Sequence, residues 1–183
     1  MGVGTVRRAV FLDRDGVLNE AVVREGQPYP PSTAAEVQLV HGAAEGLQRL
    51  KQIGFLLLVV TNQPDVARGT QTIAEVEAIN DVLRAALPLD DFFMCLHTGD
   101  GCDCRKPKPG LLLQGAERYG LSLQDCYVIG DRWRDMDAAA AAGVPGVWID
   151  YGYHERGPTT APAVQVKNVR EAVDWIVNQE NCS

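Results

Sequence analysis

Short apolar runs that end at polar residues alternate along this chain with segments of helical periodicity. The apolar runs cover residues 9–12, 55–60, 92–96, 126–129 and 146–149. Runs that are apolar at consecutive positions predict strands buried on both faces, as in parallel sheets. Helical spacing of three and four residues is found over residues 43–53, 72–86, 111–119, 135–142 and 169–177. This alternation predicts an α/β fold with a doubly wound, mainly parallel sheet and right-handed crossovers.

The length of 183 residues suits a single domain. Because no insertion between the predicted elements is large enough to form a cap, we expect residues 1–183 to form one capless domain. Residues 19–35, which contain Pro28, Pro30 and Pro31, and residues 152–166 are expected to be surface loops. Ligands of such sheets bind beyond the carboxyl ends of the strands, so polar residues at those ends are the first candidates for a site.

The charge balance excludes some kinds of partner. The chain has 17 basic and 24 acidic residues, a net charge of −7, whereas a general nucleic-acid binder needs a basic face. No apolar run reaches the roughly 18 residues of a membrane span, and no signal-peptide pattern opens the chain. We expect a cytoplasmic monomer that binds neither nucleic acid nor membrane. A small phosphorylated substrate is compatible with this composition, because a pocket can be locally basic.

Two aspartates directly after the first predicted strand form the most specific motif, Phe11-Leu12-Asp13-Arg14-Asp15-Gly16. Asp13 and Asp15 are two residues apart, and Gly16 lets the chain turn. Like charges this close repel unless a counterion neutralises them, and Mg²⁺ prefers oxygen ligands of this kind. The alternative is a solvated turn with two unrelated aspartates.

A second acidic motif, Gly130-Asp131-Arg132-Trp133-Arg134-Asp135, follows another apolar run. Asp131 is at the predicted strand tip, and we expect it to bind the same cation. Asp135 has a simpler interpretation, because an aspartate in the first turn of a helix interacts favourably with the helix dipole.

Two further segments carry groups that suit a phosphoryl ligand. Thr61-Asn62 follows the second apolar run and offers a hydroxyl and backbone donors, although the same pair is ordinary turn chemistry. Arg105-Lys106-Pro107-Lys108 holds three cations flanked by prolines, and fixed cations stabilise a transferring phosphoryl group. The alternative is a solvated basic loop, and this is the favoured interpretation of Lys108.

Five cysteines, with no sign of secretion, argue against a disulfide framework. Three of them lie close together with a histidine, as Cys95, His97, Cys102 and Cys104. Thiolate and imidazole ligands favour zinc in a closed tetrahedral site, which is structural because the protein fills every position. The predicted zinc loop, residues 95–104, leads directly into Arg105-Lys106. The alternative is a chance cluster of reduced cysteines. Cys126 and Cys182 receive no role.

The motifs follow one another in the order D-x-D-G, strand-Thr, Lys and G-D-x-x-x-D. This order resembles the haloacid dehalogenase superfamily of phosphohydrolases. The resemblance implies that Asp13 is the nucleophile, which forms an aspartyl-phosphate, and that Asp15 is the general acid/base. It implies that Thr61 binds the phosphoryl group and that Lys106 holds Asp13 and the phosphate. Mg²⁺ would be bound by Asp13, Asp131 and the backbone carbonyl of Asp15.

The cysteine-rich loop that leads into C-D-C-R-K-P-K-P-G resembles two capless subfamilies, the heptose 1,7-bisphosphate 7-phosphatases and the histidinol-phosphate phosphatases. Residues 61–69, T-N-Q-P-D-V-A-R-G, are similar to T-N-Q-S-G-I-A-R-G of the heptose enzymes. Arg68 favours these enzymes, because a bisphosphate has a second phosphate for an arginine to bind. The chain departs from the pattern at Pro64-Asp65, which replaces Ser-Gly, at Leu96, which replaces proline, and in a shortened loop after His97.

The resemblance therefore implies a Mg²⁺-dependent phosphomonoester hydrolase. A heptose bisphosphate is the first candidate substrate, and histidinol phosphate or another small sugar phosphate is the alternative. A phosphotransferase or mutase would need a closing cap to exclude water, and an inactive zinc-clipped scaffold would lack Asp13 or Asp15. Substrate contacts are expected from Asn19, Asn62, Gln63, Arg68 and Arg105, each of which has the alternative of an ordinary polar surface residue.

Overall fold

Six parallel strands form the main sheet, in the order β5-β4-β1-β6-β7-β8, in the computed structural model, which describes residues 7–182. They are β1 (Ala9–Leu12), β4 (Leu56–Asn62), β5 (Asp91–Cys95), β6 (Tyr127–Gly130), β7 (Gly146–Ile149) and β8 (Val164–Val166). From β1 the chain adds β4 and β5 on one side and then β6, β7 and β8 on the other, so the sheet is doubly wound. The predicted fold class is confirmed.

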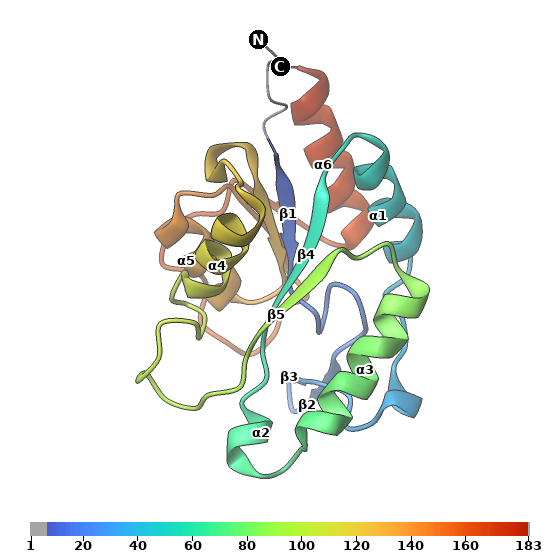
Figure 1. Ribbon diagram of the computed structural model, residues 1–183, viewed down its shortest axis with the longest axis vertical. Coiled ribbons are helices and arrows are strands. Elements are labelled where there is room, and N and C mark those ends of the chain that lie inside the picture. Colours follow the sequence, from blue (N-terminus) through green and yellow to red (C-terminus); the bar gives the residue numbers. More distant parts are fainter. Residues whose placement is uncertain (1–6, 183) are drawn as a thin grey trace.

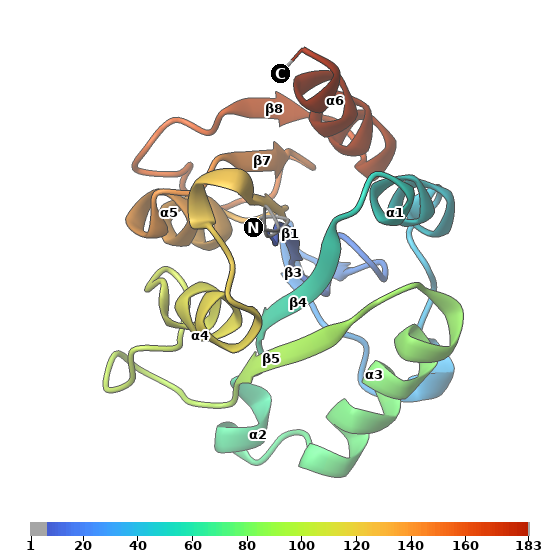
Figure 2. The same cartoon turned by 45° about the horizontal axis from the view of Figure 1, so that its top comes forward.

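Helices cover both faces of this sheet (Figures 1 and 2). They are α1 (Ala43–Gln52), α2 (Asp65–Arg68), α3 (Ile73–Ala86), α4 (Gly110–Tyr119), α5 (Trp133–Ala142) and α6 (Val169–Asn181), with 3-10 turns at Ala34–Glu36 and Leu123–Asp125. Helix α1 packs against α6 on one face, and α4 packs against α5 on the other. Strand β1 serves both layers, because Val10 and Leu12 point into the core beneath α1 and α6, whereas Ala9 and Phe11 point into the core beneath α4 and α5.

The central strand β1 aligns the carboxyl ends of its neighbours. Leu12 lies beside Val59 of β4 and Ile129 of β6, and the amide of Asp13 donates a hydrogen bond of 3.0 Å to the Ile129 carbonyl. The direction of winding reverses between β1 and β6, which makes this edge the topological switch point where ligands of such sheets bind. The residues after β1, β4 and β6 therefore meet at one crevice.

Two segments expected to be surface loops contain strands. Residues 19–35 hold an antiparallel hairpin of β2 (Val22–Arg24) and β3 (Gln27–Tyr29). Residues 152–166 end in β8, the outermost strand of the main sheet. The loop prediction is wrong for β8 because a three-residue edge strand, Val-Gln-Val, is too short to give a recognisable pattern.

None of the helices between residues 7 and 182 combines the length and the apolar character needed to cross a membrane.

Candidate active site and thiol cluster

Three buried carboxylates meet at the switch point. Asp13 follows β1, Asp131 follows β6, and Asp135 lies in the first turn of α5. Each is less than 8% exposed, and one oxygen of each lies within 4.8 Å of the others. Asp135, expected only to interact with its helix dipole, is thus part of the cluster.

A single buried ammonium group lies among these carboxylates. Lys106 Nζ donates hydrogen bonds to Asp13 Oδ1 at 2.9 Å, to Asp135 Oδ1 at 2.5 Å and to the Val60 carbonyl at 2.7 Å. Against the effect of burial, the charges of Asp13 and Asp135 raise the pKa of Lys106 above its usual value, so the side chain stays protonated. Lys106 therefore lies in contact with Asp13, as the resemblance implies.

One ammonium does not balance three carboxylates. Burial, together with the charges of Asp135 and Asp15, raises the pKa of Asp13 to about 6, although Lys106 opposes this. Burial and the charges of Asp13 and Asp135 raise the pKa of Asp131 well above its usual range. Asp131 Oδ1 is buried and has no hydrogen-bond partner among the described residues. An unpaired carboxylate oxygen within a crowded acidic cluster fits a hard divalent cation such as Mg²⁺.

Asp15 points toward a separate set of donors. Arg14, which is fully buried, donates to its carboxylate through Nε and Nη2, each at 3.2 Å. Asn19 Nδ2 donates at 2.9 Å and Gln63 Nε2 at 2.8 Å. Arg14 is held in turn by Asn80 Oδ1 at 3.1 Å. These contacts fix the position of Asp15 beside Asp13 at the floor of the cleft.

Asn19 and Gln63 differ from their expected role. Both are at most 1% exposed and donate to Asp15, so they do not face the cleft that a substrate would enter. Gln63 Nε2 also donates to Thr61 Oγ1 at 2.8 Å, which ties Thr61 to Asp15. Their burial explains the difference, because an amide removed from water needs a hydrogen-bond partner inside the protein.

A cleft of about 310 Å³ is lined by Asp13 and Asp135, two of the three clustered carboxylates, and Asp131 is not among its lining residues. The expected site residues that line it are Asp13, Asp15, Thr61, Asn62, Arg68, Arg105 and Lys106. Further lining residues are Gln27, Pro28, Tyr29 and Pro30 of the hairpin, and Arg132 and Arg134 after β6, of which sequence reasoning missed the two arginines. Arg68, Arg105, Arg132 and Arg134 place cationic groups in the cleft of an acidic protein, and such groups suit an anionic ligand.

Asn62 and Arg68 take different positions in this cleft. The amide of Asn62 donates to the Lys106 carbonyl at 3.0 Å and accepts from the Lys106 amide at 3.1 Å, so it fixes the backbone that carries the ammonium. Arg68, with its side chain 55% exposed, pairs with Asp65 at 3.1 Å. Arg105 donates to the His97 carbonyl at 3.0 Å.

A larger cavity of about 920 Å³ lies on the far side of Gly16, against Tyr151 and Tyr153. It is lined by none of the three clustered carboxylates, so the smaller cleft is the candidate active site.

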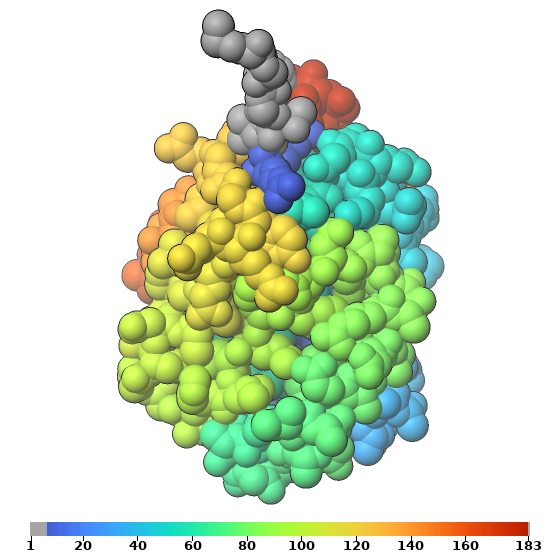
Figure 3. All heavy atoms as spheres, viewed as in Figure 1, coloured from blue at the N-terminus to red at the C-terminus, as the bar shows by residue number. Residues whose placement is uncertain are grey.

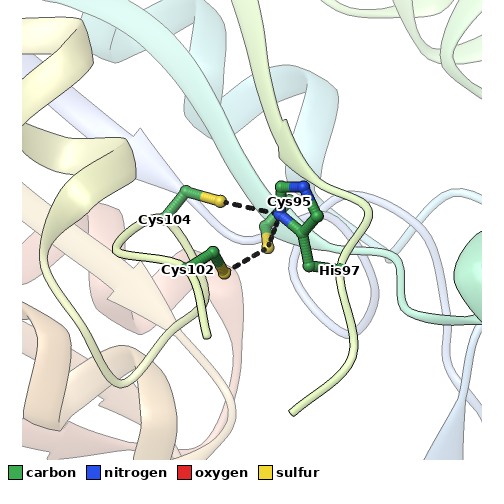
Figure 4. Close-up of side chains that lie close together, drawn as sticks. All are labelled: Cys95, His97, Cys102 and Cys104. Carbon is green, nitrogen blue, oxygen red and sulfur yellow. Dashed lines mark hydrogen bonds between the residues drawn. The ribbon is translucent and has the colours of Figure 1, made fainter. Parts of the chain in front are cut away.

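The four predicted thiol and imidazole ligands converge after β5 (Figure 4). Cys95 Sγ lies 3.7 Å from Cys102 Sγ and 3.6 Å from His97 Nδ1, and Cys104 Sγ lies 3.4 Å from the same nitrogen. A tetrahedral ion with metal–sulfur bonds of about 2.3 Å separates its sulfur ligands by roughly 3.8 Å. The spacing therefore fits a tetrahedral metal centre.

The segment that carries this cluster is at the surface. It appears in yellow-green in Figure 3, on the same face as the green α2–α3 segment. Lys108 Nζ donates to the carbonyls of Asp100 and Cys102, both at 2.7 Å. These bonds and the thiol cluster hold the segment that ends at Arg105 and Lys106, so the cluster is coupled to the candidate active site through the backbone.

Comparison with known proteins agrees with this geometry. Residues 21–143 match the family model of the haloacid dehalogenase-like hydrolases. The chain belongs to this family, as the order of its motifs predicts.

Individual relatives show which members of this family the chain is similar to. The chain is 33% identical to a Helicobacter pylori protein, over 94% of this chain and 98% of that protein, and 34% identical to an Escherichia coli protein, over 93% and 88%. Both relatives are named D-glycero-beta-D-manno-heptose-1,7-bisphosphate 7-phosphatase. A solved D,D-heptose 1,7-bisphosphate phosphatase from B. bronchiseptica, complexed with magnesium and phosphate, matches with a TM-score of 0.76 and 27% identity over 95% of this chain and 99% of that one. The predicted resemblance to these phosphatases is confirmed.

Substitution of Asp131 tests the crowding of the carboxylates. Because the folded state raises the pKa of Asp131, stability from this group is present at low pH and is lost as the pH rises through the folded-state pKa. In buffer without divalent cations, Asp131→Asn should melt above the wild type at pH 8. The rise should be about 2–4 °C for each kcal/mol of unfavourable free energy that the substitution removes. The difference should shrink toward pH 4 in scanning calorimetry.

Asp137, which lies in α5 shortly after Asp131 in the sequence, provides the matched control. Hydrogen bonds from Thr159 and Arg156 outweigh burial and lower the pKa of Asp137, so Asp137→Asn should instead reduce the melting temperature at pH 8. A lower melting temperature for Asp131→Asn at pH 8 would contradict the crowding argument.

Proposed function

We propose that the protein is a Mg²⁺-dependent phosphatase that removes the 7-phosphate of a heptose 1,7-bisphosphate through an aspartyl-phosphate on Asp13. The observation that carries this proposal is the contact of Asp13 with Lys106, 2.9 Å long, at the tip of β1 and beside Asp131. This arrangement combines a nucleophilic carboxylate, a fixed cation and a second metal ligand in one cleft. The family match and the named relatives support the same chemistry.

The reaction follows from the contacts of each side chain. Asp13 Oδ1 is held by the Arg14 amide at 2.8 Å and by Lys106, so Oδ2 attacks phosphorus as the bond to the ester oxygen breaks. Asp15 protonates that leaving oxygen and then takes a proton from the water that cleaves the aspartyl-phosphate. The hydroxyl of Thr61 and the ammonium of Lys106 bind the phosphoryl oxygens.

Mg²⁺ would be held by Asp13, Asp131 and the backbone carbonyl of Asp15, with Asp135 adjacent to them. When bound, it supplies positive charge to the transferring phosphoryl group. Support comes from the unpaired Asp131 Oδ1 and from the magnesium and phosphate of the related B. bronchiseptica structure.

A second phosphate on the substrate suits the arginines at the cleft rim. Arg68, Arg105, Arg132 and Arg134 line the cleft in addition to Lys106, which is more positive charge than one reacting phosphoryl group needs. Heptose bisphosphate is favoured over histidinol phosphate because the named relatives act on the former. Residues 7–182 form no separate domain over the cleft, so it would admit an extended sugar.

We further propose that Cys95, His97, Cys102 and Cys104 bind a structural zinc ion. The spacing of their ligand atoms supports this, as does the choice of thiolate and imidazole ligands. The ion would hold the segment that leads to Arg105 and Lys106, and so help to orient the catalytic ammonium.

Substitution of the nucleophile tests the chemistry. Asp13→Asn keeps the size and shape of the side chain but removes the attacking oxygen, so kcat should fall by about 10⁴-fold or more, while circular dichroism stays that of the folded protein. Trapping of ³²P from labelled substrate should give an acid-stable phosphoprotein with the wild type alone. Retained turnover by Asp13→Asn would contradict the assignment of Asp13 as the nucleophile, whereas absence of turnover by the wild type would favour an inactive scaffold.

A panel of phosphate esters tests the substrate. The value of kcat/KM should be highest for a heptose 1,7-bisphosphate, with histidinol phosphate and heptose monophosphates lower. Arg68→Ala should raise KM for the bisphosphate by about 10-fold or more, because a hydrogen bond to a charged group is lost, and should change KM for a monophosphate little. Arg84→Ala is the matched control, since Arg84 forms a comparable i,i+3 pair with Asp81 on α3. A preference for histidinol phosphate would overturn the substrate assignment.

Removal of one thiol tests the zinc. Cys102→Ala should lose the single bound zinc ion, measured by elemental analysis, and should melt at lower temperature with faster proteolysis between residues 96 and 105. Cys182→Ala removes an exposed cysteine outside the cluster and should keep both zinc and stability. A Cys102→Ala protein with full zinc content and an unchanged melting temperature would contradict the assignment.

A further inference from the structure

The segment Tyr151–Arg156, directly after β7, contacts several parts of the catalytic region. Tyr151 Oη donates to the Gly16 carbonyl at 2.9 Å, and Tyr153 Oη donates to Asp131 Oδ2 at 2.8 Å. The amide of His154 donates to the Gly26 carbonyl in the β2–β3 hairpin at 2.8 Å. The segment therefore connects the loop after β1, the loop after β6 and the hairpin, and it lies outside the residues that match the family model.

Two groups lie against the carboxylate of Asp131, namely the backbone of Gly16 and the phenol of Tyr153. Gly16 has a φ of +92°, and a Cβ atom there would lie 1.9 Å from Asp131 Oδ2, so the carboxylate lies directly against the backbone of Gly16. From the other side, Oδ2 accepts the hydrogen bond of Tyr153. The remaining oxygen, Oδ1, is the buried atom without a hydrogen-bond partner among the described residues.

We propose that Tyr153 is a positioning residue for Asp131, whose phenol fixes the carboxylate so that Oδ1 is turned toward the divalent cation. The inference rests on the proposed Mg²⁺ site. The carbon–carboxylate torsion of an aspartate is broad and nearly two-fold, so a hydrogen bond to one oxygen is what selects its rotation. Groups that hydrogen bond to ligating carboxylates orient them and tune metal binding.

The rest of Tyr153 is held independently of this bond. Its ring packs on that of Tyr151, with centroids 5.7 Å apart, and the neighbouring His154 and Glu155 are anchored to Gly26 and Arg132. Tyr153→Phe therefore removes the hydroxyl and leaves these contacts. Its main effect should fall on the orientation of Asp131.

Calorimetric titration of the protein with MgCl₂ alone tests this positioning role. Tyr153→Phe should raise the Kd for Mg²⁺ by about 10-fold or more and, at the same Mg²⁺ concentration, should give a smaller Mg²⁺-induced rise in melting temperature than the wild type. At saturating Mg²⁺, kcat should return close to the wild-type value. Tyr119→Phe is the matched control, because Tyr119 Oη donates to the carboxylate of Asp91 at 3.0 Å, away from the cleft, and its Kd should equal that of the wild type.

A second variant separates positioning from general loosening of the segment. Tyr151→Phe removes the bond to Gly16 and leaves the bond to Asp131, so its Kd should change much less than that of Tyr153→Phe. If Tyr151→Phe and Tyr153→Phe lose Mg²⁺ affinity equally, or if Tyr153→Phe keeps the wild-type Kd, the positioning role is overturned. Neither result would contradict the Mg²⁺ site itself. Absence of Mg²⁺ binding by the wild type would overturn the site and, with it, this inference.

Discussion

A buried ammonium group among buried carboxylates is the interaction on which the rest of the site depends. Lys106 is 3% exposed and donates to both Asp13 and Asp135, and a charge this deep in a protein is tolerated only when it is paired. Its position is therefore built from several directions. Asn62 fixes its backbone by two hydrogen bonds, and the thiol cluster holds the segment that precedes it. Lys106 and the loop of the thiol cluster thus belong to one continuous segment of backbone that is held from both sides.

The parallel sheet brings the three carboxylates to one edge, and two glycines let them approach each other closely. Asp131 lies against Gly16, and a Cβ atom at Gly130 would lie 2.2 Å from that of Asp135. With any side chain at either position, the acidic cluster would have to spread apart. Gly16 and Gly130 are thus tied to the electrostatics of the site, because burial together with the crowding of the carboxylates raises the pKa of Asp13 and makes a divalent cation favourable there.

The parts of this protein that follow from local sequence pattern were predictable. Buried strands are recognisable as apolar runs, and Asp13 and Asp131 lie next to two of them, whereas Lys106 is recognisable from its basic motif. Asp135 was assigned only a helix-dipole role because nothing local indicates that Lys106 lies against it. Arg14 and the two tyrosines were missed for the same reason: Tyr151 is 135 positions from its partner Gly16. Such contacts depend on how distant loops meet, which neither periodicity nor motif spacing encodes. The sequence predicts Asn19 and Gln63 as substrate contacts, because polar residues near a site are expected at its surface. In the structure both side chains are buried and donate hydrogen bonds to Asp15.

The cleft separates its charges by depth, and this explains how a protein of net charge −7 can bind a phosphate ester. Carboxylates form the floor and require a cation, while arginines occupy the rim and attract anions. Asp65 is an exception to this separation of charges, because it is a carboxylate that lies among the arginines of the cleft. It stands where similar phosphatases have glycine, and it pairs with Arg68 at 3.1 Å. Under the proposed function, a second phosphate would compete with Asp65 for this arginine. Because the pair is exposed and worth little in water, while a dianionic phosphate carries more charge than a carboxylate, the competition would favour the substrate.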